Sequence, residues 1–121
     1  MTQSSNSKIY DLEERTFQFA KEVRLFIKTL EKAIANIEDA KQVVRSSGSV
    51  GANYIEANES LSKKDFVFRI KISRKEAKES IYWLRLLNET NNLSNKKVIE
   101  KLIQEATELK KIFSAIIEKS K

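Results

Sequence analysis

The sequence predicts an all-α fold, namely an antiparallel up-down four-helix bundle. Proline is absent and there are only two glycines, Gly48 and Gly51, whereas strands and turns usually contain these residue types. Four segments repeat apolar residues every three or four positions, which is the period of one buried helix face. The links between them are short and polar, and short links force neighbouring helices to run antiparallel. At 121 residues the chain has the size of one domain, so we expect residues 1–121 to form a single domain with a flexible tail at 1–9.

The first helix is expected to begin near Tyr10 or Asp11 and to end after Glu31 or Lys32. Acidic residues at its start stabilise the positive end of the helix dipole. The apolar positions of its buried face are Leu12, Phe19, Ala20, Val23, Phe26, Ile27 and Leu30.

The second helix is expected to begin with Asn36 as its N-cap. Its predicted buried face consists of Ile37, Ala40, Val44, Ser47, Gly51 and Ile55. The stretch from Ser46 to Gly51 has two interpretations. Glycine and serine favour a loop there, whereas a continuous helix would have a narrow waist that lets a neighbouring helix approach closely.

The third helix is expected to begin after Ser62 and to run to about Asn88. Its predicted seam has alternating spacings of four and three residues, as in a heptad, and consists of Phe66, Ile70, Ser73, Ala77, Ser80, Leu84 and Leu87. The small residues at the centre of this seam match the small residues of the second helix, which favours the continuous second helix. The fourth helix follows with Ser94 or Asn95 as cap and buries Ile99, Leu102, Ala106, Leu109, Phe113 and Ile116.

On a helical wheel the third helix has three faces, one more than a monomeric bundle requires. Between Lys63 and Lys78 there are seven basic and two acidic residues, so this segment carries most of the net charge of +6. The basic face, opposite the seam, consists of Lys63, Lys64, Lys71, Arg74, Lys75 and Lys78, with Tyr82 in line. Between the two lies an apolar strip formed by Phe68, Ile72, Trp83 and Leu86.

These two faces predict two kinds of partner. Large apolar side chains away from a core usually mark an interface, so the apolar strip favours self-association over cover by loops or by the terminal tail. A concentrated basic face favours RNA, DNA or another polyanion over a solvated helix surface. Such binding would be salt-sensitive and directed at phosphates. Phe68 and Tyr82 are candidates for stacking on unpaired bases, although Phe68 equally fits burial between subunits.

The residues needed for most catalysis are missing. The chain has no histidine and no cysteine, which removes the usual general base and the usual nitrogen and sulfur metal ligands. Glu56 and Glu59, and Glu76 and Glu79, have helical spacing, but di-iron bundles add a histidine three residues after glutamate; salt bridges are the expected role of these pairs. The stretch around Gly48 lacks the lysine and the preceding strand of a phosphate-binding loop. We therefore expect no enzyme, no metal and no cofactor.

The expected compartment is the cytoplasm. The first eight residues are polar and lack the apolar stretch of a signal peptide. No later run approaches the roughly 20 apolar residues of a membrane span, so no membrane association is expected.

Four motifs together resemble a known family. They are DLEERTF at 11–17, RSSGSVGANYIEA at 45–57, SKKDF at 62–66 and EAKES at 76–80. From Asp11 to about Leu87 the chain resembles the bacterial four-helix-bundle family first noticed as open reading frames in ribosomal-RNA intervening sequences. The fourth helix matches this family only in its general character.

The resemblance implies a continuous second helix, assembly into a homopentameric ring, and no enzymatic activity. A related branch, the accessory proteins of diversity-generating retroelements, consists of basic pentamers that associate with a reverse transcriptase and with nucleic acid. The resemblance also implies that Arg45, Asn53 and Glu56 make polar contacts inside the bundle, where they would fix the register of the helices.

The leading hypothesis is therefore a homo-oligomeric binding protein that associates with RNA or DNA through the basic face. The alternative is a scaffold or adaptor that binds a protein partner, such as a reverse transcriptase, without touching nucleic acid. In that case the lysines would serve only solubility.

Overall fold

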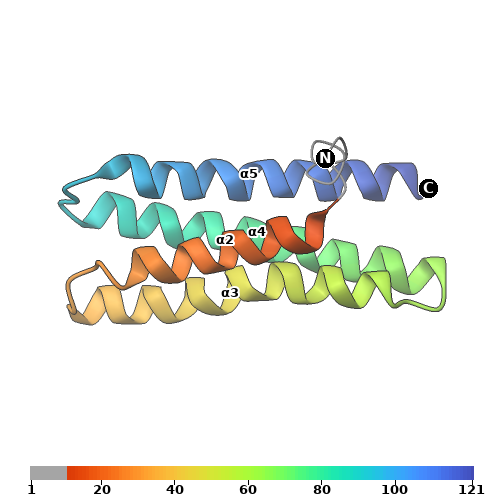
Figure 1. Ribbon diagram of the computed structural model, residues 1–121, viewed down its shortest axis with the longest axis horizontal. Helices are drawn as coiled ribbons and strands as arrows, with labels where there is room; N and C mark the ends of the chain where they lie inside the picture. The colour runs from red at the N-terminus through yellow and green to blue at the C-terminus, as the bar shows by residue number, and fades with distance from the viewer. Residues whose placement is uncertain (1–10) are drawn as a thin grey trace, which may run out of the picture.

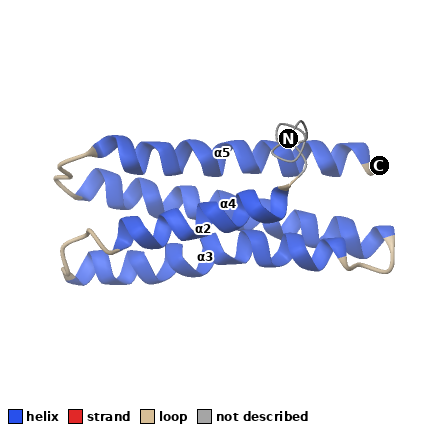
Figure 2. Cartoon of the chain, in the orientation of Figure 1, coloured by secondary structure: helices blue, strands red, loops and turns tan. Residues whose placement is uncertain are grey.

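A computed structural model describes residues 11–121 of the chain. The predicted tail at 1–9 lies outside these described residues. Four helices follow one another: α2 (Leu12–Ile27), α3 (Ile34–Asn58), α4 (Lys63–Thr90) and α5 (Lys96–Lys119). Neighbours in sequence run antiparallel and are joined by short connections (Figures 1 and 2). The predicted all-α, antiparallel four-helix arrangement is confirmed.

Side-chain caps fix the starts of three of these helices. The carboxylate of Asp11 accepts a hydrogen bond from the Glu14 backbone N–H at 3.0 Å, and the Ser62 hydroxyl accepts one from the Asp65 N–H at 3.1 Å. The Asn95 side chain accepts one from the Lys97 N–H. Each of these bonds satisfies a backbone donor that the first helical turn leaves without a partner. Asp11, Ser62 and Asn95 are therefore caps, which confirms the predicted cap at Asn95 and the predicted helix starts near Asp11 and after Ser62.

The predicted cap of α3 is wrong. The helix begins at Ile34, with Ala33 in the N-cap position and no side-chain cap. Asn36 lies within the first turn and is buried, and its amide donates to the Glu31 carbonyl at 3.0 Å. It also exchanges hydrogen bonds of 2.8 Å with Asn91, which follows α4. Asn36 therefore ties the start of α3 to the end of α4 instead of capping its own helix.

The second helix is continuous, which settles the two interpretations of its glycine and serine stretch in favour of the narrow waist. α3 runs unbroken through Gly48 and Gly51. A Cβ atom at Gly51 would lie only 2.7 Å from Thr16 Oγ1, so α2 crosses α3 too closely for any side chain there. On the α4 side, the buried hydroxyls of Ser46 and Ser80 lie 2.8 Å apart. Close packing of α2 and α4 on the two sides of this stretch stabilises the helical conformation, for which the local sequence has only a weak preference.

The buried register of α3 differs from the prediction. Val43, Val50 and Ala57 point into the core, whereas the predicted core residues Ile37 and Ile55 are 42% and 46% exposed. Ser47 and Gly51 of the predicted face are buried as expected, so the prediction is wrong toward the two ends of that face, at Ile37 and Ile55. Periodicity finds such faces without telling which one the chain itself covers.

The cores of α4 and α5 agree with the prediction, whereas α2 ends at Ile27 and not after Glu31 or Lys32, and Ala20, Ile27 and Leu30 of its predicted face are only half-buried. The seam of α4 and the apolar face of α5 are buried, apart from Phe66 and Ile116, which are half-buried. α4 packs along α3 on one side and along α5 on the other, and the shorter α2 packs on α3 and, less extensively, on α5 (Figure 1). No helix among residues 11–121 is long and apolar enough to cross a membrane.

Candidate nucleic-acid interface

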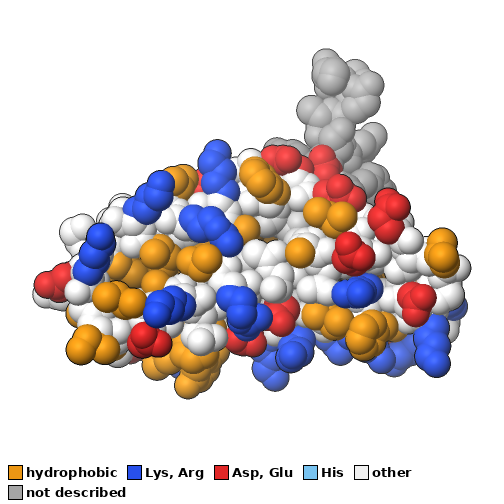
Figure 3. Space-filling model, turned by 90° about the horizontal axis from the view of Figure 1, so that it is seen from below, with side chains coloured by type: hydrophobic (Ala, Val, Ile, Leu, Met, Phe, Trp, Pro, Cys, Tyr) orange, Lys and Arg blue, Asp and Glu red, His pale blue; other side chains and the backbone are white. Residues whose placement is uncertain are grey.

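The lysines of the basic face all lie at the surface. Lys63, Lys64, Lys71, Lys75 and Lys78 are exposed, and none of them forms an ion pair within 4.0 Å with any residue of the described range 11–121. Figure 3 shows Lys and Arg side chains gathered along one edge of the molecule, toward the end where α4 begins. No acidic side chain among residues 11–121 is therefore paired directly with these lysines.

Arg74 behaves differently from these lysines. It is half-buried, and its Nη1 donates a hydrogen bond of 3.3 Å to Ser114 Oγ on α5. Arg69, which precedes it by five residues, is likewise half-buried and donates to Asn53 Oδ1 on α3 at 3.1 Å. Both arginines use part of their hydrogen-bonding capacity to join helices, so the freely available part of the basic face consists of lysines.

The apolar strip divides into two parts. Phe68 is 58% exposed, whereas Ile72, Trp83 and Leu86 are half-buried. The Trp83 ring packs against the core cluster, and its Nε1 donates to Glu79 Oε2 at 3.1 Å. Trp83 therefore contributes to the fold of the single chain, and Phe68 is the member of the strip with the most uncovered surface.

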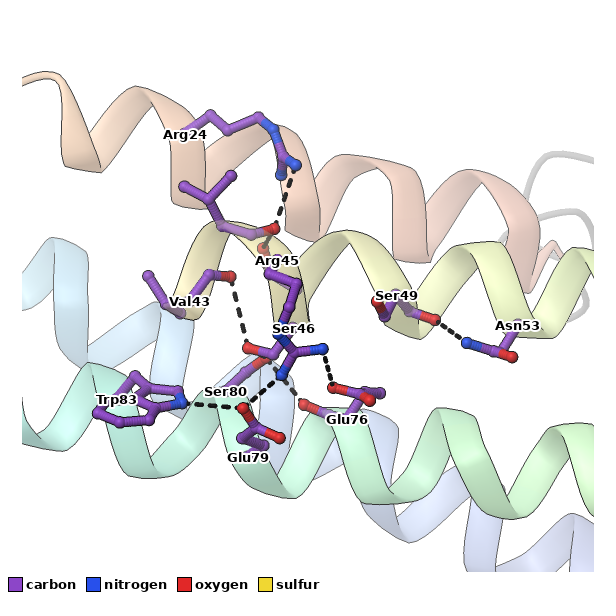
Figure 4. Close-up of polar contacts among 12 residues, drawn as sticks. Arg24, Val43, Arg45, Ser46, Ser49, Asn53, Glu76, Glu79, Ser80 and Trp83 are labelled. Atoms are coloured by element: carbon purple, nitrogen blue, oxygen red, sulfur yellow. Dashed lines mark hydrogen bonds and ion pairs between the residues drawn. The ribbon is translucent and has the colours of Figure 1, made fainter. Parts of the chain in front are cut away.

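A polar cluster joins α3 to α4 beside this strip (Figure 4). Arg45 of α3 forms ion pairs with Glu79 and, at 3.2 Å, with Glu76. Glu76 is only 6% exposed, and a buried carboxylate needs such a partner because desolvation otherwise penalises its charge. The expectation that Glu76 and Glu79 form salt bridges is confirmed, and their partner comes from the neighbouring helix. For Glu56 and Glu59 the expectation is wrong, since neither forms an ion pair with any residue of 11–121.

The three residues expected inside the bundle are placed in three different ways. Arg45 is half-exposed but makes the interhelical contacts just described. Asn53 is half-buried, donates to the Ser49 carbonyl and accepts from Arg69. Glu56 is exposed, so its expected place inside the bundle is wrong for the single chain. Ala57 takes the buried position in that turn, which turns Glu56 toward solvent.

The charges of the polar cluster stabilise one another. The pKa of Glu79 lies below its ordinary value, chiefly because the Trp83 indole N–H donates to the carboxylate and also because Arg45 pairs with it. The pKa of Arg45 is raised, chiefly by its hydrogen bond to Glu79. Both groups are thus charged at neutral pH, and Glu79 Oε2 accepts from two donors, Trp83 Nε1 and Arg45 Nη2.

Catalytic constellations are not found in the part of the chain that the structure describes. No group of three or more Asp or Glu side chains there is placed to hold a metal ion. A groove of about 530 Å³ lies between the end of α2 and the connection from α4 to α5, lined by apolar residues such as Phe26 and Leu93, by asparagine amides and hydroxyls, and by the carboxylates of Glu22 and Glu31.

Sequence periodicity did not identify the outward apolar residues of α3. Ile34 and Ile37 near its start and Ile55 near its end are exposed, as is Leu61 in the following connection. The signal was present, because Ile37 and Ile55 share a helix face, but that face was assigned to the core. Together with Phe68, they are apolar surface that residues 11–121 leave uncovered.

Comparison with known proteins places the chain in a family. Residues 8–115 match the model of the 23S rRNA-intervening sequence proteins. Among solved structures, the chain is similar to a protein of unknown function from Bacteroides thetaiotaomicron VPI-5482, described as belonging to the S23 ribosomal protein family. The two are 30% identical, the alignment covers 87% of this chain and 96% of that one, and the TM-score is 0.76. A search of curated proteins finds no match.

These findings confirm the resemblance that the four motifs indicated. The family match includes all of α2, α3 and α4 and most of α5. The chain therefore belongs to the 23S rRNA-intervening sequence protein family.

Proposed function

We propose that this protein is a non-enzymatic, homo-oligomeric binding protein that associates with nucleic acid through the lysines of α4. The observation that carries the proposal is that these lysines are exposed and have no acidic partner within residues 11–121. Two acidic side chains of the same helix, Glu76 and Glu79, are already paired with Arg45. A row of uncompensated positive charge attracts a polyanion and releases its condensed counterions on contact.

The names of the relatives are consistent with RNA as the polyanion. The matching family is named after intervening sequences of 23S rRNA, and the similar structure is described by a ribosomal protein family. Duplex and single-stranded forms of RNA and DNA all carry the phosphates that lysines contact, so the proposal covers both nucleic acids.

Self-association is supported by the apolar surface that the single chain leaves uncovered. A closed ring of identical subunits needs two different patches on each subunit, one for each neighbour. The exposed face of α3 with Ile37 and Ile55 and the exposed Phe68 of α4 offer two such patches. The pentameric ring implied by the family resemblance would repeat the lysines of α4 around its surface and multiply their field.

Binding is tested by anisotropy of labelled single- and double-stranded RNA and DNA at low and moderate salt. Three phosphate contacts should make affinity fall about 20- to 40-fold between 50 and 200 mM salt. The variant Lys71→Glu, Lys75→Glu, Lys78→Glu should abolish binding. Its matched control reverses Lys21, Lys28 and Lys32, which are equally exposed but belong to α2 and the link that follows, so both variants have the same net charge. Equal loss in both, or no binding at low salt, would refute the proposal.

A protein scaffold is the second candidate, and the exposed apolar residues of α3 favour it. In that case mass in solution would show a stable oligomer, while none of the four nucleic acids would bind even at low salt. The same two measurements therefore separate the candidates.

A further inference from the structure

Tyr82 is an exposed aromatic ring that the rest of the chain holds in place. It is 56% exposed, and its ring contacts Trp83 edge to face, with centroids 4.9 Å apart and planes at 80°. Trp83 in turn packs against the core cluster. Because the Tyr82 ring packs against a fixed neighbour, it has less rotational freedom to lose when another molecule stacks on it.

The neighbour is itself fixed by hydrogen bonds that extend to a second helix. Trp83 Nε1 donates to Glu79 Oε2 at 3.1 Å, and the same oxygen accepts from Arg45 Nη2 of α3. Figure 4 shows Arg45, Glu79 and Trp83 pointing toward one another from the two helices. Glu79 is therefore a positioning residue for Trp83 and, through it, for Tyr82.

Three lysines precede Tyr82 on the same outward face of α4. Lys71, Lys75 and Lys78 are followed by Tyr82 at spacings of four, three and four residues, which keeps all four side chains on one side of the helix. At 1.5 Å per residue, Lys78 lies about 6 Å and Lys71 about 16 Å from Tyr82 along the axis. An exposed ring thus ends a short row of unpaired positive charges.

This combination distinguishes between forms of nucleic acid. Phosphates of either a duplex or a single strand can lie on lysines, but the bases of a duplex are stacked inside and present no free face. An unpaired base does present a face, and proteins that bind single strands combine basic tracks with aromatic platforms. The exposed ring therefore adds a contact that only an unpaired base can make.

We infer that Tyr82 is a stacking platform for an unpaired base of a single-stranded nucleic acid whose phosphates lie on Lys71, Lys75 and Lys78. The inference rests on the proposed function, since it assigns a strand form and a base contact to the same face of α4. In this arrangement Tyr82 selects single strands over duplexes, and the lysines attract the phosphates of either form.

The test compares Tyr82→Ala with Tyr82→Phe, using a labelled RNA strand of about 15 nucleotides alone and annealed to its complement. Tyr82→Ala keeps the charge and should weaken single-strand binding roughly 5- to 150-fold, with the salt dependence unchanged. Tyr82→Phe keeps the ring and should bind as the wild type does. Phe17→Ala, which removes a ring that is 61% exposed on α2, should have no effect.

Two further readouts examine the platform itself. Trp83 is the only tryptophan of the chain. A base stacked on Tyr82 should therefore change the tryptophan fluorescence, whereas binding of the duplex should leave it unchanged. Glu79→Gln should reduce the preference for single strand over duplex and leave the salt dependence of duplex binding unchanged.

The outcomes separate this inference from the proposal beneath it. Equal binding of both strand forms, with Tyr82→Ala behaving as the wild type, would overturn the stacking platform and leave the lysine face intact. Absence of salt-sensitive binding to either form would overturn both. If Tyr82→Ala lowers the mass of the protein in solution, the ring belongs to an interface between copies, and the inference is wrong.

Discussion

The crossing of α2 over α3 predicts opposite effects for two similar substitutions, Gly51→Ala and Gly48→Ala. A Cβ atom at Gly51 would lie 2.7 Å from Thr16 Oγ1 and 3.1 Å from Thr16 Cβ. Thr16 has no room to give way, because it is buried and its hydroxyl donates to the Leu12 carbonyl at 2.7 Å. A Cβ atom at Gly48 would meet only the guanidinium end of Arg24, at 3.1 Å.

The net effects follow from two opposing contributions. Replacing a helical glycine by alanine stabilises the helix by about 1 kcal/mol, and this gain is the same at both positions. At Gly51 the new atom is roughly 0.7 Å short of ordinary van der Waals contact, which begins at 3.4 Å, and such overpacking costs about 1–3 kcal/mol. Because Thr16 cannot give way, the cost at Gly51 should lie in the upper part of this range, at about 2–3 kcal/mol. After the helix gain of about 1 kcal/mol, Gly51→Ala should lose about 1–2 kcal/mol in the free energy of unfolding. Gly48→Ala should be neutral or gain up to about 1 kcal/mol, since the exposed Arg24 side chain can move aside.

Urea unfolding at one fixed protein concentration measures both changes, and the fixed concentration matters because self-association would alter apparent stability. In thermal unfolding of a chain of this length, Gly51→Ala should lower Tm by roughly 3–10 °C. In the double variant with Thr16→Ala the nearest clashing atom is gone, so the two substitutions should cost less together than the sum of their separate costs. If Gly51→Ala were as stable as Gly48→Ala, the close crossing of the two helices would be refuted.

Two further predictions concern the polar cluster and the outer face of α3. The folded pKa of Glu79 lies below its ordinary value of 4.5, so the stabilising effect of its charge is complete at neutral pH and is lost as the pH falls through the folded pKa. Glu79→Gln should therefore flatten the acid side of the plot of unfolding free energy against pH, measured by urea unfolding. An unchanged plot would contradict the stabilising role of the Glu79 charge. Ile55→Glu places a charge on the exposed α3 face without entering the core and should lower the mass measured in solution by light scattering, with helix content retained. A mass unchanged by Ile55→Glu would exclude this part of the face from the interface.

The parts of the fold set by local chemistry were predictable from the sequence. Asp11, Ser62 and Asn95 each precede a helix and cap it, because their side chains accept from a backbone N–H two or three residues on. The waist of α3 was predictable only by comparison with α4, since serine and glycine alone favour a loop. Asn36 was misassigned because its partner, Asn91, is 55 residues away and no local pattern indicates it.

The candidate site was predictable in composition but not in pairing. The exposure of the α4 lysines follows from their position opposite the seam. That Arg74 bonds to Ser114 on α5, and that Arg45 takes up both Glu76 and Glu79, depends on how the helices are rotated against each other. Side-chain spacing within one helix contains no information on that rotation.

The error in the register of α3 bears on the proposed assembly. The helix has one apolar set that the chain buries, with Val43 and Val50, and another, with Ile37 and Ile55, that stays exposed. Exposed apolar residues scattered singly need no explanation, but a second set on a common helix face is what an interface between chains requires. Ser47 and Gly51 of the predicted face are buried by the same chain, so the prediction failed at Ile37 and Ile55, toward the two ends of the helix. A neighbouring copy that covers this face would leave the outward side of α4, with its lysines and Tyr82, open to nucleic acid.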